Sequence, residues 1–345
     1  DPLAGLAAGP AGFPPGLIFI GWGSEFTTPY AHHYNLTVQR KLGDNVGVEV
    51  GYVGSRGYNM PMFLEVNPTA PILTPPARRG PRVYPAYSLV RPTFSVARSW
   101  YDSLQASARM RPTRGLNFLA SYTWGHAIDH ISGLNIGNAD QLRPVLPVDL
   151  NDLSTVDAVL AREKGDALFD IRHRFVLSFG WELPTLEGRG ALARNVLGGW
   201  QLNGIFQKQT GFPLTVYDSV DVALMALPNR PNQICDANAA APHTVERWFD
   251  TSCFQRLTVA ANAGQIGDAG RNTVRGPGFV RTDLSLFKNI GIVRDHNLQV
   301  RVEAFNLFNQ ARFGQPGGVI GSPLFGVITA AEEGRIVQLG LRYSF

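Results

Sequence analysis

The chain ends on the stretch RIVQLGLRYSF, residues 335–345, in which apolar residues alternate with mostly polar or small ones up to the last position. Chain ends usually fray and carry little pattern. A period of two residues is that of a β-strand, whose successive side chains point to opposite faces of a sheet. The stretch therefore predicts a terminal strand whose apolar face is formed by Val337, Leu339, Leu341, Tyr343 and Phe345.

The same alternation recurs along the chain. Residues 34–42 and 46–53 alternate on either side of Gly43-Asp44-Asn45, a turn sequence, and so predict a hairpin. Further alternating segments lie at 102–110, 116–124, 171–182, 200–206 and 298–304. At about 9 to 13 residues they are longer than usual strands, and several end in Trp, Tyr or Phe. Tilted strands of this length span a bilayer, and terminal aromatic residues are typical of outer-membrane barrels.

The connections between these segments alternate in length. Short connections lie at 43–45, 112–115, 184–197 and 291–295, and long ones lie at 56–99, 128–169, 218–277 and 309–334. Antiparallel barrels have tight periplasmic turns at one end and long extracellular loops at the other. The sequence therefore predicts an all-β, antiparallel transmembrane barrel of about ten strands over residues 33–345. Residues 1–32 are expected to form part of an extracellular loop. Because lipid offers no hydrogen bonds to the backbone, such a sheet must close on itself.

Composition narrows the function classes. The 345 residues carry a net charge of +4 and contain only 17% charged residues, which gives no support for nucleic-acid binding. The sequence contains no run of about 18 apolar residues, so it predicts no membrane-spanning helix. The clearest helical candidate, residues 154–164, is short. The sequence shows no nucleotide-binding motif and no supported catalytic set. We therefore expect no enzyme activity, cofactor or metal site.

Two cysteines, Cys235 and Cys253, lie in one irregular stretch. In an oxidising compartment they could close a loop of roughly 20 residues, worth up to about 3 kcal/mol in the loop-entropy model. The alternative is two free thiols. Trp248, Phe249 and Phe254 lie beside them. Aromatic residues on loops of a rigid barrel are candidates for ligand recognition, and the alternative is that they pack against one another.

Several charged residues fall on the polar side of the predicted strands. Alternation places six of them on the lumen side of a barrel: Arg109, Arg172, Arg174, Glu182, Arg301 and Glu303. A polar interior is the structural default for such barrels. These residues are therefore predicted to line the lumen, and any contact with a substrate is a further hypothesis.

Five segments carry a resemblance to a known family. They are SYTWGHAID (121–129), DIRHRFVLSFGWELP (170–184), LGGWQLNGIFQKQTGFPLTV (197–216), GDAGRNTVRGPGFVRTDLSLFKNI (267–290) and EAFNLFNQARFG (303–314). In this order they resemble the C-terminal barrel half of Oar-like TonB-dependent receptors. The resemblance implies a 22-stranded barrel preceded by a plug and a carboxypeptidase-regulatory-like domain. With about ten strands, this chain then corresponds to the C-terminal part.

The resemblance also implies a cellular location and partners for the chain. The location is the outer membrane of a Gram-negative bacterium. The alternating C-terminus resembles the signal that the barrel-assembly machinery reads, and energy would come from the TonB system through the missing N-terminal part. The implied function is uptake of a scarce nutrient, and the substrate classes left open are a small molecule, a glycan and a peptide.

Two other classes of protein remain open. The first is a stand-alone small barrel or an adhesive surface protein. The second is an outer-membrane barrel enzyme, which is less favoured because no acidic or Ser/His constellation is found near the predicted loops. A soluble β-sandwich is a more distant alternative.

Overall fold

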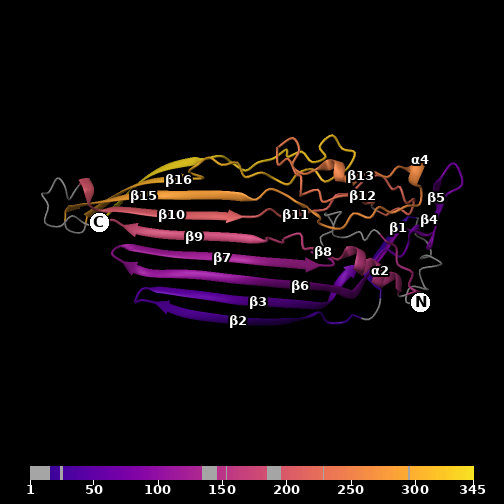
Figure 1. The fold of residues 1–345 in the computed structure, drawn as a ribbon, viewed down its shortest axis with the longest axis horizontal. Coiled ribbons are helices and arrows are strands. Elements are labelled where there is room, and N and C mark those ends of the chain that lie inside the picture. The colour runs from indigo at the N-terminus through magenta and orange to yellow at the C-terminus, as the bar shows by residue number, and fades with distance from the viewer. Residues whose placement is uncertain are drawn as a thin grey trace.

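One long antiparallel sheet dominates the computed structural model, which describes residues 16–23, 26–133, 146–152, 154–184, 196–227, 229–293 and 296–345 (Figure 1). Nine strands follow one another across it in chain order: β2 (Tyr30–Leu42), β3 (Val46–Phe63), β6 (Tyr87–Thr113), β7 (Leu116–Asp129), β9 (His173–Glu182), β10 (Trp200–Gln209), β15 (Phe279–Val293), β16 (His296–Phe305) and β17 (Ile336–Ser344). The predicted all-β antiparallel fold is confirmed.

The two faces of the sheet differ in polarity because cross-strand partners share a face. On the face that we call the apolar face, Leu339 and Leu341 of β17 stand opposite Val302 and Val300 of β16. Register continues this face across the sheet through Leu284, Leu202, Phe206, Leu177, Phe118, Ala120, Ala108, Val48 and Val38. The opposite, polar face carries Gln338, Glu303, Ser285, Asn203, Asn117, Ser121, Ser107, Glu49 and Gln39.

The strands connect differently at their two ends (Figure 1). At the turn end, on the left of Figure 1, β2 and β3 are joined through 43–45, and β6 and β7 through Arg114 and Gly115 alone. Both of these residues have positive φ, 50° and 82°. This matches a two-residue hairpin turn of the type that follows the twist of the strands.

The loop end, on the right of Figure 1, holds the short elements. They are β1 (Leu17–Trp22), β4 (Thr69–Ile72), β5 (Arg78–Arg82), α2 (Ser154–Glu163), β8 (Gly165–Asp166), β11 (Pro213–Leu214), β12 (Asn232–Gln233), η2 (Thr251–Cys253), β13 (Phe254–Gln255), α4 (Val259–Asn262) and β14 (Val274–Arg275). The helix predicted at 154–164 is confirmed as α2.

Two predicted loop boundaries are wrong. β3 runs to Phe63 and β6 begins at Tyr87, so this strand pair continues far into the predicted loop 56–99. Within the predicted loop 1–32, β1 pairs in parallel with β6, and β2 already begins at Tyr30. The prediction followed the apolar–polar alternation, which ends at Val53, whereas the pairing of β3 with β6 continues to Phe63 and Thr93.

The sheet has two open edges in the part of the chain that the structure describes. There β2 pairs only with β3, and β17 pairs only with β16. The apolar side chains of these edge strands are strongly exposed, as with Leu36 (71%) and Leu339 (80%). The two edge strands β2 and β17 therefore do not pair with each other to close a barrel.

Buried apolar cores lie among the segments of the loop end. In the first core, Val159 of α2 packs with Leu64 and with Val90 of β6. In the second, Val216, Phe249 and Val274 are fully buried. Across the ranges given above, no helix has the length and apolar character needed to cross a membrane.

Candidate functional site

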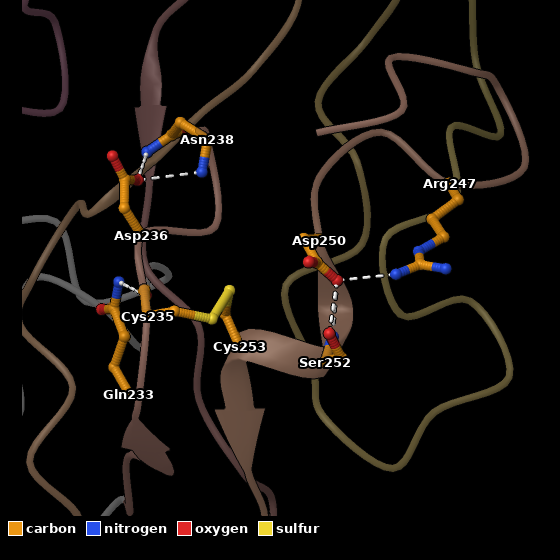
Figure 2. The surroundings of a disulfide bond; sticks show 8 residues. All are labelled: Gln233, Cys235, Asp236, Asn238, Arg247, Asp250, Ser252 and Cys253. Carbon is orange, nitrogen blue, oxygen red and sulfur yellow. Dashed lines mark hydrogen bonds and ion pairs between the residues drawn. A yellow bond between two sulfur atoms is a disulfide. The ribbon is translucent and has the colours of Figure 1, made fainter. Parts of the chain in front are cut away.

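The segment around residues 232–255 is closed by a disulfide, and its bonded sulfurs are shown in Figure 2. Cys235 and Cys253, 18 positions apart, have Cα atoms 4.9 Å apart. β12 and β13 pair directly beside the bond, with Gln233 opposite Phe254. The Ile234 amide also donates to the Cys253 carbonyl at 2.9 Å. The disulfide alternative for the two cysteines is confirmed.

Polar side chains fix the backbone on both sides of this bond (Figure 2). Asp250 accepts hydrogen bonds from the Ser252 amide at 3.1 Å and the Ser252 hydroxyl at 2.7 Å, and it forms an ion pair with Arg247 at 2.6 Å. These contacts, the Ser252 hydrogen bonds first, lower the pKa of Asp250. Asp236 accepts from the Asn238 amide at 2.9 Å in the same manner. Such local turns hold the loop without regular secondary structure.

The aromatic residues of this loop form a core. Phe249 is 0% exposed, and its ring meets Phe325 edge-on at 5.3 Å and Phe254 at 6.0 Å. Of the two alternatives for Phe249 and Phe254, the structure shows mutual packing, because both rings are buried. Trp248 is half-buried, and its indole N–H donates to the Arg275 carbonyl at 2.9 Å. A recognition role for Trp248 stays a prediction.

Removing the disulfide is expected to loosen this loop. In a variant with both cysteines changed to serine, the free energy that holds residues 233–255 in place should fall by up to about 3 kcal/mol, since a closed loop of this length loses its entropic constraint in the open state. Hydrogen exchange at the Ile234 amide measures the change. The wild-type protein treated with a reductant serves as the comparison, and an unchanged exchange rate in both would show that the hydrophobic core alone holds the loop.

Buried ion pairs join two loops that are distant in sequence. Arg271 pairs with the Asp129 carboxylate, and it also donates to the Asp129 carbonyl at 2.5 Å and the Glu163 carbonyl at 2.9 Å. Arg230 pairs with Glu163 at 2.5 Å, and both side chains are buried. Buried charges are costly unless they are paired and hydrogen-bonded. These contacts therefore bind the segment 129–165 to the segment 230–271.

A second charged cluster lies where β7 and β9 enter the loops. Asp166 accepts from Arg172 at 2.9 Å and from His126 at 2.8 Å, and it pairs with Arg275. Burial raises the pKa of Asp166, but the hydrogen bonds from His126 and Arg172 and the charge of Arg275 outweigh burial, so the pKa is lowered overall. Asp170 joins the cluster through Arg172 at 2.8 Å and Arg275 at 2.5 Å. Arg172, predicted to line the lumen, thus lies bound in this cluster just before β9.

Protonation of His130 makes the stability of the loop end depend on pH. Its Nδ1 accepts from the Arg98 amide at 3.3 Å, and burial together with the charges of Arg271, Arg98 and Lys164 lowers its pKa from 6.5 to about 4. Because the folded-state pKa lies below the ordinary one, the unfolded state binds more protons between these two values, and stability falls as pH drops through this window.

Acidification from pH 7 to 5 is therefore expected to destabilise the loop end by about 2 kcal/mol through His130. Asp166 does not contribute to this loss of stability, because a carboxyl group with a lowered pKa loses its stabilising effect only below the ordinary pKa of 3.8. Hydrogen exchange of the His130 amide, bonded to the Arg98 carbonyl at 3.2 Å, reports the change. In His130→Gln the same acidification should have little effect, and an equal loss in that variant would contradict the assignment.

The structure separates the other predicted lumen residues from the loop clusters. Alternation and register place Arg109, Arg174, Glu182, Arg301 and Glu303 on the polar face of the sheet. Arg301 donates to Gln299 at 2.5 Å and stacks over the Phe287 ring at 4.9 Å. Their role as lumen lining stays a prediction.

The C-terminal residues predicted as an assembly signal lie on the apolar face. Val337, Leu339, Leu341 and Tyr343 stand opposite Ala304, Val302, Val300 and Leu298 of β16. Phe345 is 88% exposed, and its ring lies 5.8 Å from that of Tyr343. Recognition of this segment by assembly machinery stays a prediction.

Sequence reasoning missed the residues that join the loops, namely Asp129, Glu163, Arg230, Arg271 and Arg275. The available signal is complementary charge: the segment 129–170 supplies the carboxylates, and the segment 230–275 supplies the arginines. Within the described ranges, no group of three or more His, Cys, Asp or Glu side chains is placed to hold a metal ion.

Comparison with known proteins agrees with this architecture. The outer membrane beta barrel domain family matches residues 2–338, and the chain belongs to this family. Its place is therefore the outer membrane of a Gram-negative bacterium. None of the curated proteins matches the chain closely enough to serve as a relative.

Solved structures with a similar fold are receptors and transporters. The outer membrane transporter YddB from Escherichia coli is 10% identical, with a TM-score of 0.50 over 95% of this chain and 34% of its own. BauA, the ferric preacinetobactin receptor from Acinetobacter baumannii, is 13% identical, with a TM-score of 0.44 over 91% of this chain and 29% of its own. The chain thus spans about a third of the length of the solved structures that it matches.

Proposed function

We propose that this chain is part of the wall of a larger outer-membrane barrel, a TonB-dependent receptor that takes up a scarce nutrient. The observation that carries the proposal is the open sheet, which has one apolar face and, among the described residues, no strand paired to the outer edge of β2 or of β17. A strand edge in lipid would leave backbone groups without partners. Further strands, up to the 22 of the Oar-like receptors, would complete the wall at both edges.

The loop end would face the outside of the cell and capture the substrate. The ion pairs of Arg230 and Arg271 and the disulfide would hold two of its loops as one body, which gives a binding surface a fixed shape. The substrate class would be a small molecule, a glycan or a peptide. Energy would come from TonB through a plug supplied by another part of the parent protein, and the assembly machinery would read the C-terminal strand.

The intact mass of the protein isolated from its native membrane tests the proposal. A mass of about three times 37.6 kDa is expected, because the chain covers 34% of YddB. A mass near 37.6 kDa would instead favour a stand-alone small barrel with a passive or adhesive role, and the receptor proposal would be abandoned.

The proposed orientation is tested by labelling single cysteines on intact cells. The natural cysteines are bonded to each other and do not react with a maleimide. A membrane-impermeant maleimide is expected to label Ser219→Cys at the loop end and to leave Asp44→Cys at the turn end unlabelled; both positions are exposed. Labelling of Asp44→Cys alone would reverse the orientation.

A further inference from the structure

A groove of about 480 Å³ lies on the polar face at the turn end, between β2, β3 and β6. Its floor is Gly47, which stands between Lys41 of β2 and Arg109 of β6 in the cross-strand register. A Cβ atom at Gly47 would meet no atom within 4 Å, so the missing side chain leaves open space there. Arg111 follows on the same face of β6, next to the β2–β3 turn, where its amide donates to the Asn45 carbonyl at 2.9 Å.

The lining of the groove is basic. Three cations on the polar face, Lys41, Arg109 and Arg111, lie near two carboxylates, Asp44 and Glu49. Arg40 also borders the groove, but it stands opposite Val48, so the register directs its side chain to the apolar face. Glu49 already accepts a hydrogen bond from Gln39 at 2.5 Å, and Lys41 meets Asp44 at 3.6 Å in an exposed pair. Exposed ion pairs of this kind contribute little to stability, so this pair is easily exchanged for another.

Two of these three cations have no side-chain partner among the described residues. The guanidinium groups of Arg109 and Arg111 make neither an ion pair nor a hydrogen bond within the part of the chain that the structure describes. A binding partner that brings carboxylates would therefore gain charge-assisted hydrogen bonds without breaking existing ones.

The spacing of the charges favours an extended peptide. Arg109 and Arg111 lie two residues apart on one strand, about 7 Å, and Lys41 lies two strands away from Arg109, about 10 Å. A single small anion is too small to contact all three. Acidic side chains at alternate positions of an extended segment repeat at about 7 Å, which matches the pair on β6.

We propose that this groove binds an acidic extended peptide segment that lies on the polar face at the turn end. Its alternate carboxylates contact Arg109 and Arg111, and its backbone passes over Gly47 toward Lys41. This interaction does not depend on whether the barrel transports a nutrient.

Binding of a fluorescein-labelled (Glu-Ser)₄ peptide to the full protein in detergent micelles tests the proposal by fluorescence anisotropy. The double variant Arg109→Gln/Arg111→Gln is expected to weaken binding about tenfold or more, with a reduced salt dependence. Arg342→Gln is the matched control. It removes an arginine from the polar face of β17, at the opposite edge of the sheet, and should leave binding unchanged.

Gly47→Val tests the shape of the groove without changing its charge. Valine suits a strand, and its side chain would fill the floor, so peptide binding should weaken while the fold is kept, as checked by circular dichroism. Equal weakening by Arg342→Gln, or full competition by inorganic phosphate at the concentration of the peptide, would overturn the proposal. The first result would mean general attraction to a basic wall, and the second a site for small anions.

Discussion

Replacing Arg271 with methionine is expected to cost about 3–5 kcal/mol of loop-end stability, the usual result of breaking a buried ion pair on one side. Methionine keeps much of the side-chain volume but leaves the Asp129 carboxylate buried without its cation. The substitution also removes the Arg271 N–H groups that donate hydrogen bonds to the backbone carbonyls of Asp129 and Glu163. Native-state hydrogen exchange measures the loss at the Ala167 amide, which donates to the Ala127 carbonyl at 2.8 Å.

The control for this variant is an ion pair at the surface. Arg247 pairs with Asp250 at 2.6 Å, but about half of its side chain is exposed. Arg247→Met should cost no more than about 1 kcal/mol. Adding Asp129→Asn to Arg271→Met should recover part of the loss, because no uncompensated charge then remains buried. A similar small cost for Arg247→Met and Arg271→Met would show that the 129–271 contact does not hold the loops together.

The strands of the sheet could be predicted because their signal is local. Residues 335–345 and 116–124 alternate because one side of the sheet is apolar and the other polar, and this requirement acts on every second residue. The turn at 43–45 could be predicted for a similar reason, since Gly43 takes a positive φ of 60° that favours glycine. These features need no knowledge of distant parts of the chain.

The loop end could not be predicted in this way, because its contacts join distant segments. Arg271 meets Asp129 across 142 positions, and no local period marks either residue. For Phe249 and Phe254 the sequence left ligand recognition and mutual packing open, because their place in a loop does not decide between the two. The structure shows that this loop has a core of its own that includes Phe325. The extension of β3 and β6 was not predicted because the alternation ends at Val53, whereas the backbone pairing of the two strands continues beyond it.

A charge placed on the apolar face is expected to destabilise the folded sheet strongly in lipid. Ala120 of β7 lies on this face between Ala108 of β6 and Leu177 of β9, well inside the strand. Arginine on the lipid side of a barrel costs about 2–4 kcal/mol near the bilayer midplane. Ala120→Arg should therefore lower the free energy of unfolding by about that amount, measured by denaturant titration of the protein in lipid vesicles.

The neighbouring residue gives the matched control. Ser121 points to the polar face, where its partners are Ser107 and Val176. Ser121→Arg adds the same charge one position along the same strand, but the side chain then meets a polar surface, so the cost should stay below about 1 kcal/mol. This contrast depends on the lipid, because an arginine exposed to water on either face pays no such penalty. If Ser121→Arg is the more harmful of the two in vesicles, the faces have been assigned the wrong way round, and the polar side of the sheet meets the membrane.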